Sequence, residues 1–153
     1  MWNLNAEGRL IFVVGERQAL VPNTSGTGGM PRIGQELGRG AEGVVYEDLD
    51  QPGWVVKEFH PGGTSPLQAG NEFQNLERAR AVRPDNVVKA QAPADPRQGF
   101  LVKERVLPTD VQEDLAQKAR VLQDFLPQVP DAGGNLMWGT TVDNSTPRWL
   151  LIE

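Results

Sequence analysis

The chain has 153 residues, which fits one compact domain and is too short for a barrel of eight α/β units or for most complete two-lobed enzymes. Fifteen Lys and Arg against twenty Asp and Glu give a net charge of −5, so no overall positive field attracts nucleic acid or anionic lipid. The absence of cysteine excludes disulfides, thiolate nucleophiles and cysteine-ligated zinc, and a single histidine excludes a His-rich metal cluster. Any catalysis must therefore use carboxylates, Lys or Arg, hydroxyls or a bound metal.

The longest purely apolar run is Leu10–Val14, which is far shorter than the roughly 20 residues that cross a bilayer and too short for a secretory signal. We therefore expect a soluble protein with no Sec signal peptide, no transmembrane segment and no membrane partner. Seventeen Gly and twelve Pro lie between apolar segments and do not form one tract, which indicates many turns and not disorder.

The first thirty residues predict a separate N-terminal unit. Two β-type runs, 9–14 and 17–21, flank Gly15-Glu16 and predict a hairpin that Pro22 ends. Residues 23–29 contain only turn-forming and small polar side chains, so they predict a Gly-rich linker. We expect a boundary at about residue 30.

The middle of the chain predicts a sheet with one helix. Apolar side chains at helical spacing, from Leu67 to Val82, predict a helix that ends before Arg83-Pro84. Three β-type runs before it predict an antiparallel meander, and two more follow it, which gives five strands: 33–39, 43–49, 53–59, 87–90 and 100–106.

The last third predicts a second helix and a hairpin. Thr109 and Gln112 have the spacing of a capping box, and Pro127 ends the helix. Its expected apolar face consists of Val111, Leu115, Ala119, Leu122 and Leu126. Two short β-type runs, 135–138 and 148–153, flank a polar turn at 143–147 and predict a C-terminal hairpin.

A glycine motif, G-x-G-x-x-G-x-V, contains Gly38, Gly40 and Gly43. Because Val44-Val45-Tyr46 predicts a strand and not a helix after the glycines, a dinucleotide-binding turn is excluded. A glycine loop between two strands lets backbone amides approach a triphosphate, whereas an ordinary β-turn is the alternative.

A lysine and a glutamate that could form an ion pair follow the glycine motif. Lys57 ends the apolar run Val55-Val56 one strand after the glycine loop, and the next helix carries Glu72 and Glu77. These two glutamates are about 140° apart round the helix, so only one can face Lys57. Leu76 and Ala79 form an apolar ridge beside Glu72, which favours Glu72. A solvated strand lysine and a surface glutamate are the alternatives.

This order of glycine loop, strand lysine and helix glutamate resembles the protein kinase fold, in which the lysine holds the α- and β-phosphates of ATP and pairs with the glutamate. The resemblance implies ATP as cofactor, with Val45, Glu104 and Val106 beside the base. It places Lys103 where such folds carry an apolar side chain, so Lys103 would need to extend its ammonium to solvent or to pair with Glu104 or with another acid.

Residues 129–135 fall where kinases carry their catalytic loop, although this chain lacks its His-Arg pair and has one residue fewer between Asp and Asn. The resemblance implies that Asp131 serves the acceptor hydroxyl and that Asn135 and Glu153 hold Mg²⁺, with Glu153 in the place of the usual aspartate. A plain turn before a strand is the alternative for 131–135.

The resemblance covers about residues 33–153 and is greatest to the minimal kinases among bacterial effectors and polymorphic toxins, the OspG-like group. It implies an α+β fold with a kinase-like N-lobe at about 31–106, a five-stranded antiparallel sheet plus one helix, and a reduced, truncated C-lobe at about 107–153. The N-terminal hairpin and linker occupy 1–30.

The sequence thus predicts ATP-dependent phosphoryl transfer to a protein Ser/Thr hydroxyl, with Lys57, Glu72 and Asp131 as catalytic residues. The phosphates would lie along Gly38, Gly40 and Gly43. Expected partners are a protein substrate, or a host or regulatory protein that could complete the C-lobe, in the cytoplasm or in the cytosol of a host or target cell. The alternatives are a catalytically dead pseudokinase that acts as a binding module, and a β-rich domain with coincidental motifs.

Overall fold

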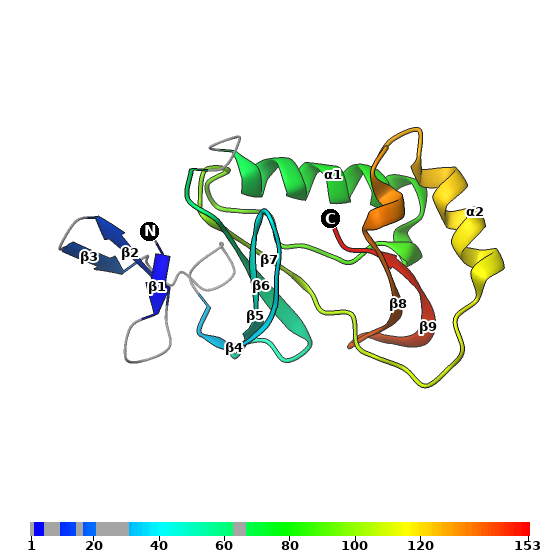
Figure 1. Ribbon diagram of the computed structural model, residues 1–153, viewed down its shortest axis with the longest axis horizontal. Coiled ribbons are helices and arrows are strands. Elements are labelled where there is room, and N and C mark those ends of the chain that lie inside the picture. The colour runs from blue at the N-terminus through cyan, green and yellow to red at the C-terminus, as the bar shows by residue number, and fades with distance from the viewer. Residues whose placement is uncertain (1, 5–9, 15–16, 21–30, 63–66) are drawn as a thin grey trace.

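The computed structural model describes residues 2–4, 10–14, 17–20, 31–62 and 67–153, the first three segments as strands only. These residues form an α+β structure with a four-stranded antiparallel sheet, a two-stranded sheet and two α-helices, together with a three-stranded N-terminal sheet (Figure 1). None of the helices in these ranges is long and apolar enough to cross a membrane.

The N-terminal sheet contains β1 (Trp2–Leu4), β2 (Leu10–Val14) and β3 (Arg17–Leu20) in the order β1-β2-β3. The antiparallel pairing of β2 with β3 confirms the predicted hairpin. The strand β1 was not predicted. The predicted Gly-rich linker at 23–29 lies outside the described residues.

The central sheet has the order β4-β5-β6-β7, all antiparallel, with β4 (Ile33–Arg39), β5 (Gly43–Asp48), β6 (Trp54–Phe59) and β7 (Phe100–Glu104). Lys57 pairs with Val45 on one side and with Leu101 on the other, so it lies on an inner strand. Gly53 has φ of +85°, a backbone conformation that few other residues adopt, and it allows the tight turn before β6.

The prediction of five strands was wrong, because residues 87–90 form only isolated bridges. Val87 bridges Leu151 in parallel, whereas Ala90 bridges Lys103 antiparallel. The segment thus divides its backbone hydrogen bonds between two neighbours: the Val88 amide donates to Leu151 O (3.1 Å), and the Gln91 amide donates to Val102 O (2.9 Å). Neither neighbour provides a continuous ladder.

The helix α1 (Gln68–Val82) agrees with the predicted helix. Four side chains at spacings of three and four are buried on one face: Ala69, Glu72, Leu76 and Ala79. Three of them are apolar and belong to the main core, with Leu101 of the sheet and Leu150 near the C-terminus. The fourth, Glu72, lies on the face that packs inward.

The helix α2 (Leu115–Phe125) begins later than predicted, because Asp114 caps it by accepting a hydrogen bond from the Gln117 amide at 3.0 Å. Thr109 instead accepts from the Val111 amide in a local turn. The predicted apolar face was wrong in part: Leu122 packs against the main core, but Leu115 is 64% exposed, and the buried side chains are Val121 and Phe125.

The C-terminal hairpin consists of β8 (Leu136–Thr141) and β9 (Asn144–Leu151). Its turn lies at 142–143, not at 143–147, so the predicted hairpin is confirmed but the predicted turn was misplaced. Because Leu150 and Leu151 share the main core with α1 and β7, the end of β9 is brought beside the central sheet. Figure 1 shows the C-terminus close to α1, between the four-stranded sheet and the β8–β9 hairpin.

Candidate functional site

The centre of the site is a buried ion pair between β6 and α1. Lys57 Nζ donates to Glu72 Oε1 at 2.6 Å, and the two side chains are 5% and 7% exposed. The predicted pairing of Lys57 with Glu72 is thus confirmed. Glu77, the other candidate, lies on the outer part of α1 and pairs with Arg80 at 3.3 Å.

Two further carboxylates contact the same lysine. Glu42 Oε2 lies 3.1 Å and Glu153 Oε1 lies 3.2 Å from Lys57 Nζ. Burial opposes the charge of Lys57, but attraction to Glu72 and the other acids outweighs it and holds the lysine pKa above its ordinary value. The hydrogen bond from Lys57 lowers the pKa of Glu42, whereas burial raises the pKa of Glu153. Glu42 was not predicted, since in the sequence it is one polar residue of a turn.

Lys103 on β7 is the second buried cation of the site. Its Nζ donates to Glu72 Oε2 at 2.9 Å and to the backbone oxygen of Ile152 at 2.5 Å. Burial lowers the pKa of Lys103 despite the attraction of Glu72. The sequence left open whether this lysine extends to solvent or pairs with Glu104 or another acid. The structure shows it buried and paired with Glu72.

The glycine motif forms the β4–β5 hairpin, as predicted. A Cβ atom added at Gly38 or Gly40 would meet no described atom within 4 Å, so packing does not require glycine there. At Gly43 a Cβ would lie 2.1 Å from Glu58 O, so this glycine is needed for strand packing. The first two glycines therefore leave open space for an approaching group, and the third does not.

His60 holds the tip of this hairpin from the end of β6. Its amide donates to Glu42 O (2.8 Å), and its Nε2 lies 2.9 Å from Gly40 O. Both partners precede β5, so no local pattern in the sequence indicates this contact. The contact fixes the position of Glu42 relative to Lys57.

An apolar pocket of about 350 Å³ lies on one side of the ion pair. Residues from several elements line it, and they include five of the seven predicted cofactor-binding residues: Gly38, Val45, Lys57, Glu104 and Val106. Gly40 and Gly43 do not. The other lining residues are Leu37, Val55, Lys103, Arg105, Met137, Ile152 and Glu153. Pockets of this size and lining accept a flat, largely apolar ring.

Backbone groups at the edge of this pocket differ in their hydrogen bonds. The Arg105 amide donates to Gly53 O at 2.9 Å, and the Leu107 amide donates to Thr140 O at 2.7 Å. Between them, the Val106 amide has no backbone acceptor within the described ranges. Val106 itself is one of the residues that line the pocket.

The side chain of Glu104 makes a different contact. Its Oε1 accepts from the Lys89 amide at 2.7 Å, and its Oε2 is buried without a partner among the described atoms. Burial raises the pKa of this carboxyl.

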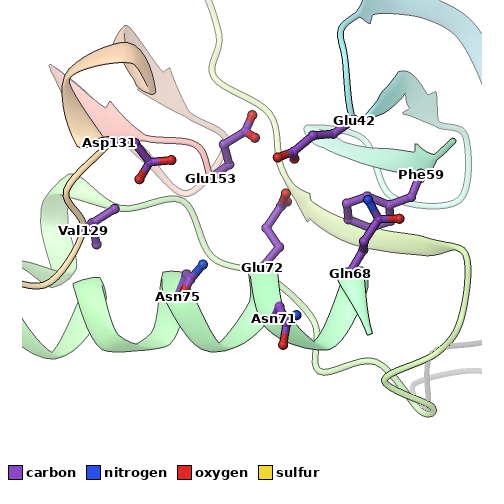
Figure 2. A pocket seen from close by; sticks show the side chains of 9 residues that line it. All are labelled: Glu42, Phe59, Gln68, Asn71, Glu72, Asn75, Val129, Asp131 and Glu153. Carbon is purple, nitrogen blue, oxygen red and sulfur yellow. The ribbon is translucent and has the colours of Figure 1, made fainter. Parts of the chain in front are cut away.

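A smaller pocket of about 180 Å³, called the acidic pocket below, lies on the other side of the ion pair, between α1, the glycine hairpin and the loop before β8. Figure 2 shows the carboxylates of Glu42, Glu72 and Glu153 pointing toward one another from three segments, with Asp131 across the pocket. Glu42, Glu72 and Glu153 can each offer one oxygen within 4.8 Å of the others. Carboxylate oxygens are the ligands that Mg²⁺ prefers, although Lys57 Nζ bonds to an oxygen of all three carboxylates and Lys103 Nζ bonds to the other oxygen of Glu72.

Asp131 and Asn135 are separated by the 3₁₀ turn 132–134. Asp131 lines the acidic pocket, whereas Asn135 is not among the lining residues, and its Nδ2 donates to Asp131 O at 3.2 Å. Asp131 and Glu153 therefore share one pocket as expected, and the metal-binding role of Asn135 stays a prediction.

The geometry combines three chemical capacities. An apolar slot can hold a planar ring, a buried ammonium can hold an anion, and clustered carboxylates can hold a divalent cation. The chain matches no family model and no curated protein. The interpretation of the site therefore rests on its residues.

Proposed function

We propose that this chain is a minimal protein kinase-like enzyme that transfers the γ-phosphoryl group of ATP to a protein Ser/Thr hydroxyl. In this proposal the four-stranded sheet with α1 is a small N-lobe, and residues from about 107 to 153 are a reduced C-lobe of the OspG-like type. The protein would act in the cytoplasm or in a host or target-cell cytosol. The observation that carries the proposal is the buried Lys57–Glu72 pair, which lies between an apolar pocket and an acidic one, next to the glycine hairpin.

The apolar pocket supports binding of the adenine ring. Val45 and Val55 from the sheet and Met137 from β8 line it, so a flat ring could be held between the two parts of the chain. The Val106 amide can donate to a ring nitrogen. This contact gives orientation, and the apolar walls give affinity.

Lys57 would hold the triphosphate. Its present partner Glu42 is 58% exposed and lies on the hairpin tip, so a phosphate oxygen can replace it with little rearrangement. Glu72 stays in place and keeps the ammonium oriented. Open space at Gly38 and Gly40 lets the backbone approach the phosphates closely.

Glu153 would hold magnesium, which would neutralise charge on the phosphates when bound. Asp131 orients the acceptor hydroxyl and accepts its proton as the new oxygen–phosphorus bond forms and the bond to the β-phosphate oxygen breaks, leaving ADP. The chain's own contribution is therefore positioning and electrostatics.

The direct test is incorporation of radiolabelled phosphate into a panel of proteins, including the chain itself. Lys57→Met should lower the rate by several orders of magnitude, because the transition-state charge loses its fixed cation. Lys118→Met is the matched control, since Lys118 packs on the Trp149 ring at 4.6 Å and lies outside the site. Equal incorporation by the wild type and Lys57→Met would defeat the proposal.

A second candidate function is a pseudokinase or truncated kinase lobe that serves as a protein-binding module. It is favoured by Asn135, whose amide bonds to the Asp131 carbonyl and does not line the acidic pocket. A thermal shift with Mg-ATP separates the candidates: a nucleotide present at 100 times its dissociation constant adds about 2.7 kcal/mol of stability. No shift at millimolar nucleotide would favour the module.

A further inference from the structure

Lys103 joins three parts of the site that are distant in sequence. Its ammonium on β7 bonds to Glu72 of α1 and to the backbone oxygen of Ile152, the residue that follows β9. The Lys103 side chain is 6% exposed, so these bonds are shielded from water. It is therefore a link between the sheet, the helix and the segment that carries Glu153.

The first consequence concerns the orientation of Glu72. Lys57 occupies Oε1 at 2.6 Å and Lys103 occupies Oε2 at 2.9 Å, so each oxygen of one carboxylate has its own cation. The terminal torsion of a glutamate is otherwise broad, and a single ion pair leaves it free to rotate. With both oxygens held, the carboxylate plane is fixed, and the direction in which Lys57 points is fixed with it.

The second consequence concerns Glu153. The Ile152 amide donates to Asn135 O at 2.9 Å, and its carbonyl accepts from Lys103. Ile152 is thus held through both of its backbone groups, and the bond from Lys103 fixes the peptide before Glu153. This places the Glu153 carboxylate in the acidic pocket, within 3.2 Å of Lys57 Nζ.

The third consequence concerns charge. Lys57 and Lys103 face Glu42, Glu72 and Glu153, so two cations and three anions leave a net charge of −1 in this cluster. Without Lys103 the net charge would be −2, at the place where a triphosphate would add more negative charge. An apolar side chain would fill the same position without the cost of burying an ammonium group, so packing alone does not explain a lysine there.

We propose that Lys103 is a positioning residue that acts through Glu72 and the peptide before Glu153, and so keeps Lys57 and Glu153 aligned for reaction. This inference deepens the proposed phosphoryl transfer and rests on it. From inside the folded core, Lys103 holds α1 and the segment that carries Glu153 in fixed positions relative to each other.

The test combines kinetics with a direct view of Lys57. In Lys103→Met, we expect kcat to fall by about 100-fold, as small misplacements of reacting groups cause, while the KM for ATP changes by less than about threefold. In a Glu72→Gln background the same substitution should cost clearly less than in the wild type, because the route through Glu72 is already broken and only the bond to Ile152 O remains. The control Lys118→Met should change neither constant.

A spectroscopic readout keeps the inference independent of activity. In ¹⁵N-lysine-labelled protein, the Lys57 ammonium signal, assigned with Lys57→Met, should shift in Lys103→Met and in the neutral but polar Lys103→Gln, and not in Lys118→Met. If the wild type transfers no phosphate, the proposed function fails and this signal alone decides the role of Lys103. An unchanged Lys57 signal, or equal kinetic costs of Lys103→Met with and without Glu72→Gln, would overturn the inference.

Discussion

Lys57→Met should also reveal how strongly the acidic cluster depends on its central cation, whatever the chain's activity. The substitution keeps the length of the side chain and removes the charge that three carboxylates share. Glu72, Glu42 and Glu153 then face one another with oxygens within 4.8 Å. Among the residues that the structure describes, Lys103 is then the remaining cation bonded to this cluster.

The magnitude follows from distance and burial. Two like charges 4.8 Å apart repel by about 3.5 kcal/mol at an effective dielectric constant of about 20. Glu42 and Glu153 are 58% and 30% exposed, so water screens part of this repulsion. Glu72 is buried, and breaking a buried pair by removing one partner costs about 3 to 5 kcal/mol. We expect a loss of about 3 kcal/mol, at the lower end of that range.

The assay is urea unfolding at pH 7, followed by fluorescence of the four tryptophans. The double variant Lys57→Met/Glu72→Gln restores the net charge of the cluster, so its cost should be smaller than the sum of the single costs by about 1 to 3 kcal/mol. Lys118→Met should stay close to the wild type. Additive costs, or an unchanged midpoint for Lys57→Met, would refute the view that this pair holds the cluster together.

Three further outcomes follow from the same geometry. Gly43→Ala should destabilise the chain by more than about 2 kcal/mol, because its Cβ would meet a carbonyl at 2.1 Å, whereas Gly40→Ala should change stability by less than about 0.5 kcal/mol; equal effects in thermal melts would contradict this. Glu104→Gln should raise stability at pH 7 by about 1 kcal/mol, because a buried carboxylate oxygen there has no partner among the described atoms. Since burial raises the pKa of Glu104, the folded state binds the Glu104 proton more readily than the unfolded chain, so wild-type stability falls as pH rises through the folded pKa. The stability gain of Glu104→Gln should therefore vanish below the ordinary glutamate pKa. A gain that persists at such a low pH would be inconsistent with this cause. Glu42→Gln should tighten Mg-ATP binding severalfold in calorimetry if the proposed function holds. The hydrogen bond from Lys57, which lowers the pKa of Glu42, is the bond that a phosphate oxygen must replace, so the Glu42 carboxylate competes with the phosphate for Lys57. Weaker binding would argue against this competition.

Much of the site was predictable where local spacing limits the possibilities. Lys57 and Glu72 were identified because an apolar ridge beside Glu72 fixes which glutamate of α1 turns inward, and the structure brings them to 2.6 Å. The glycine hairpin and β8–β9 were predicted from turn residues between β-type runs. In each case the evidence lies within a few residues of the element itself.

The details that the sequence left open depend on neighbours far away along the chain. Thr109 has the spacing of a capping residue, but Asp114 caps α2, because tertiary packing selects one among several polar candidates. Residues 87–90 have strand composition but lie between β7 and the end of β9, so they form bridges only. Glu42 and His60 meet at the glycine loop only after β5 and β6 pair.

The sequence by itself determined that a cation, an acid and a glycine turn occur in a definite order, with a helix whose inward face includes Glu72. Only the tertiary structure decided that Lys103 shares that glutamate and that Ile152 and Glu153 return to the same place. Burial is the physical reason: a lysine in a strand gives no local sign of its partner, and a buried ammonium must bond to whichever acceptors the fold brings within about 3 Å.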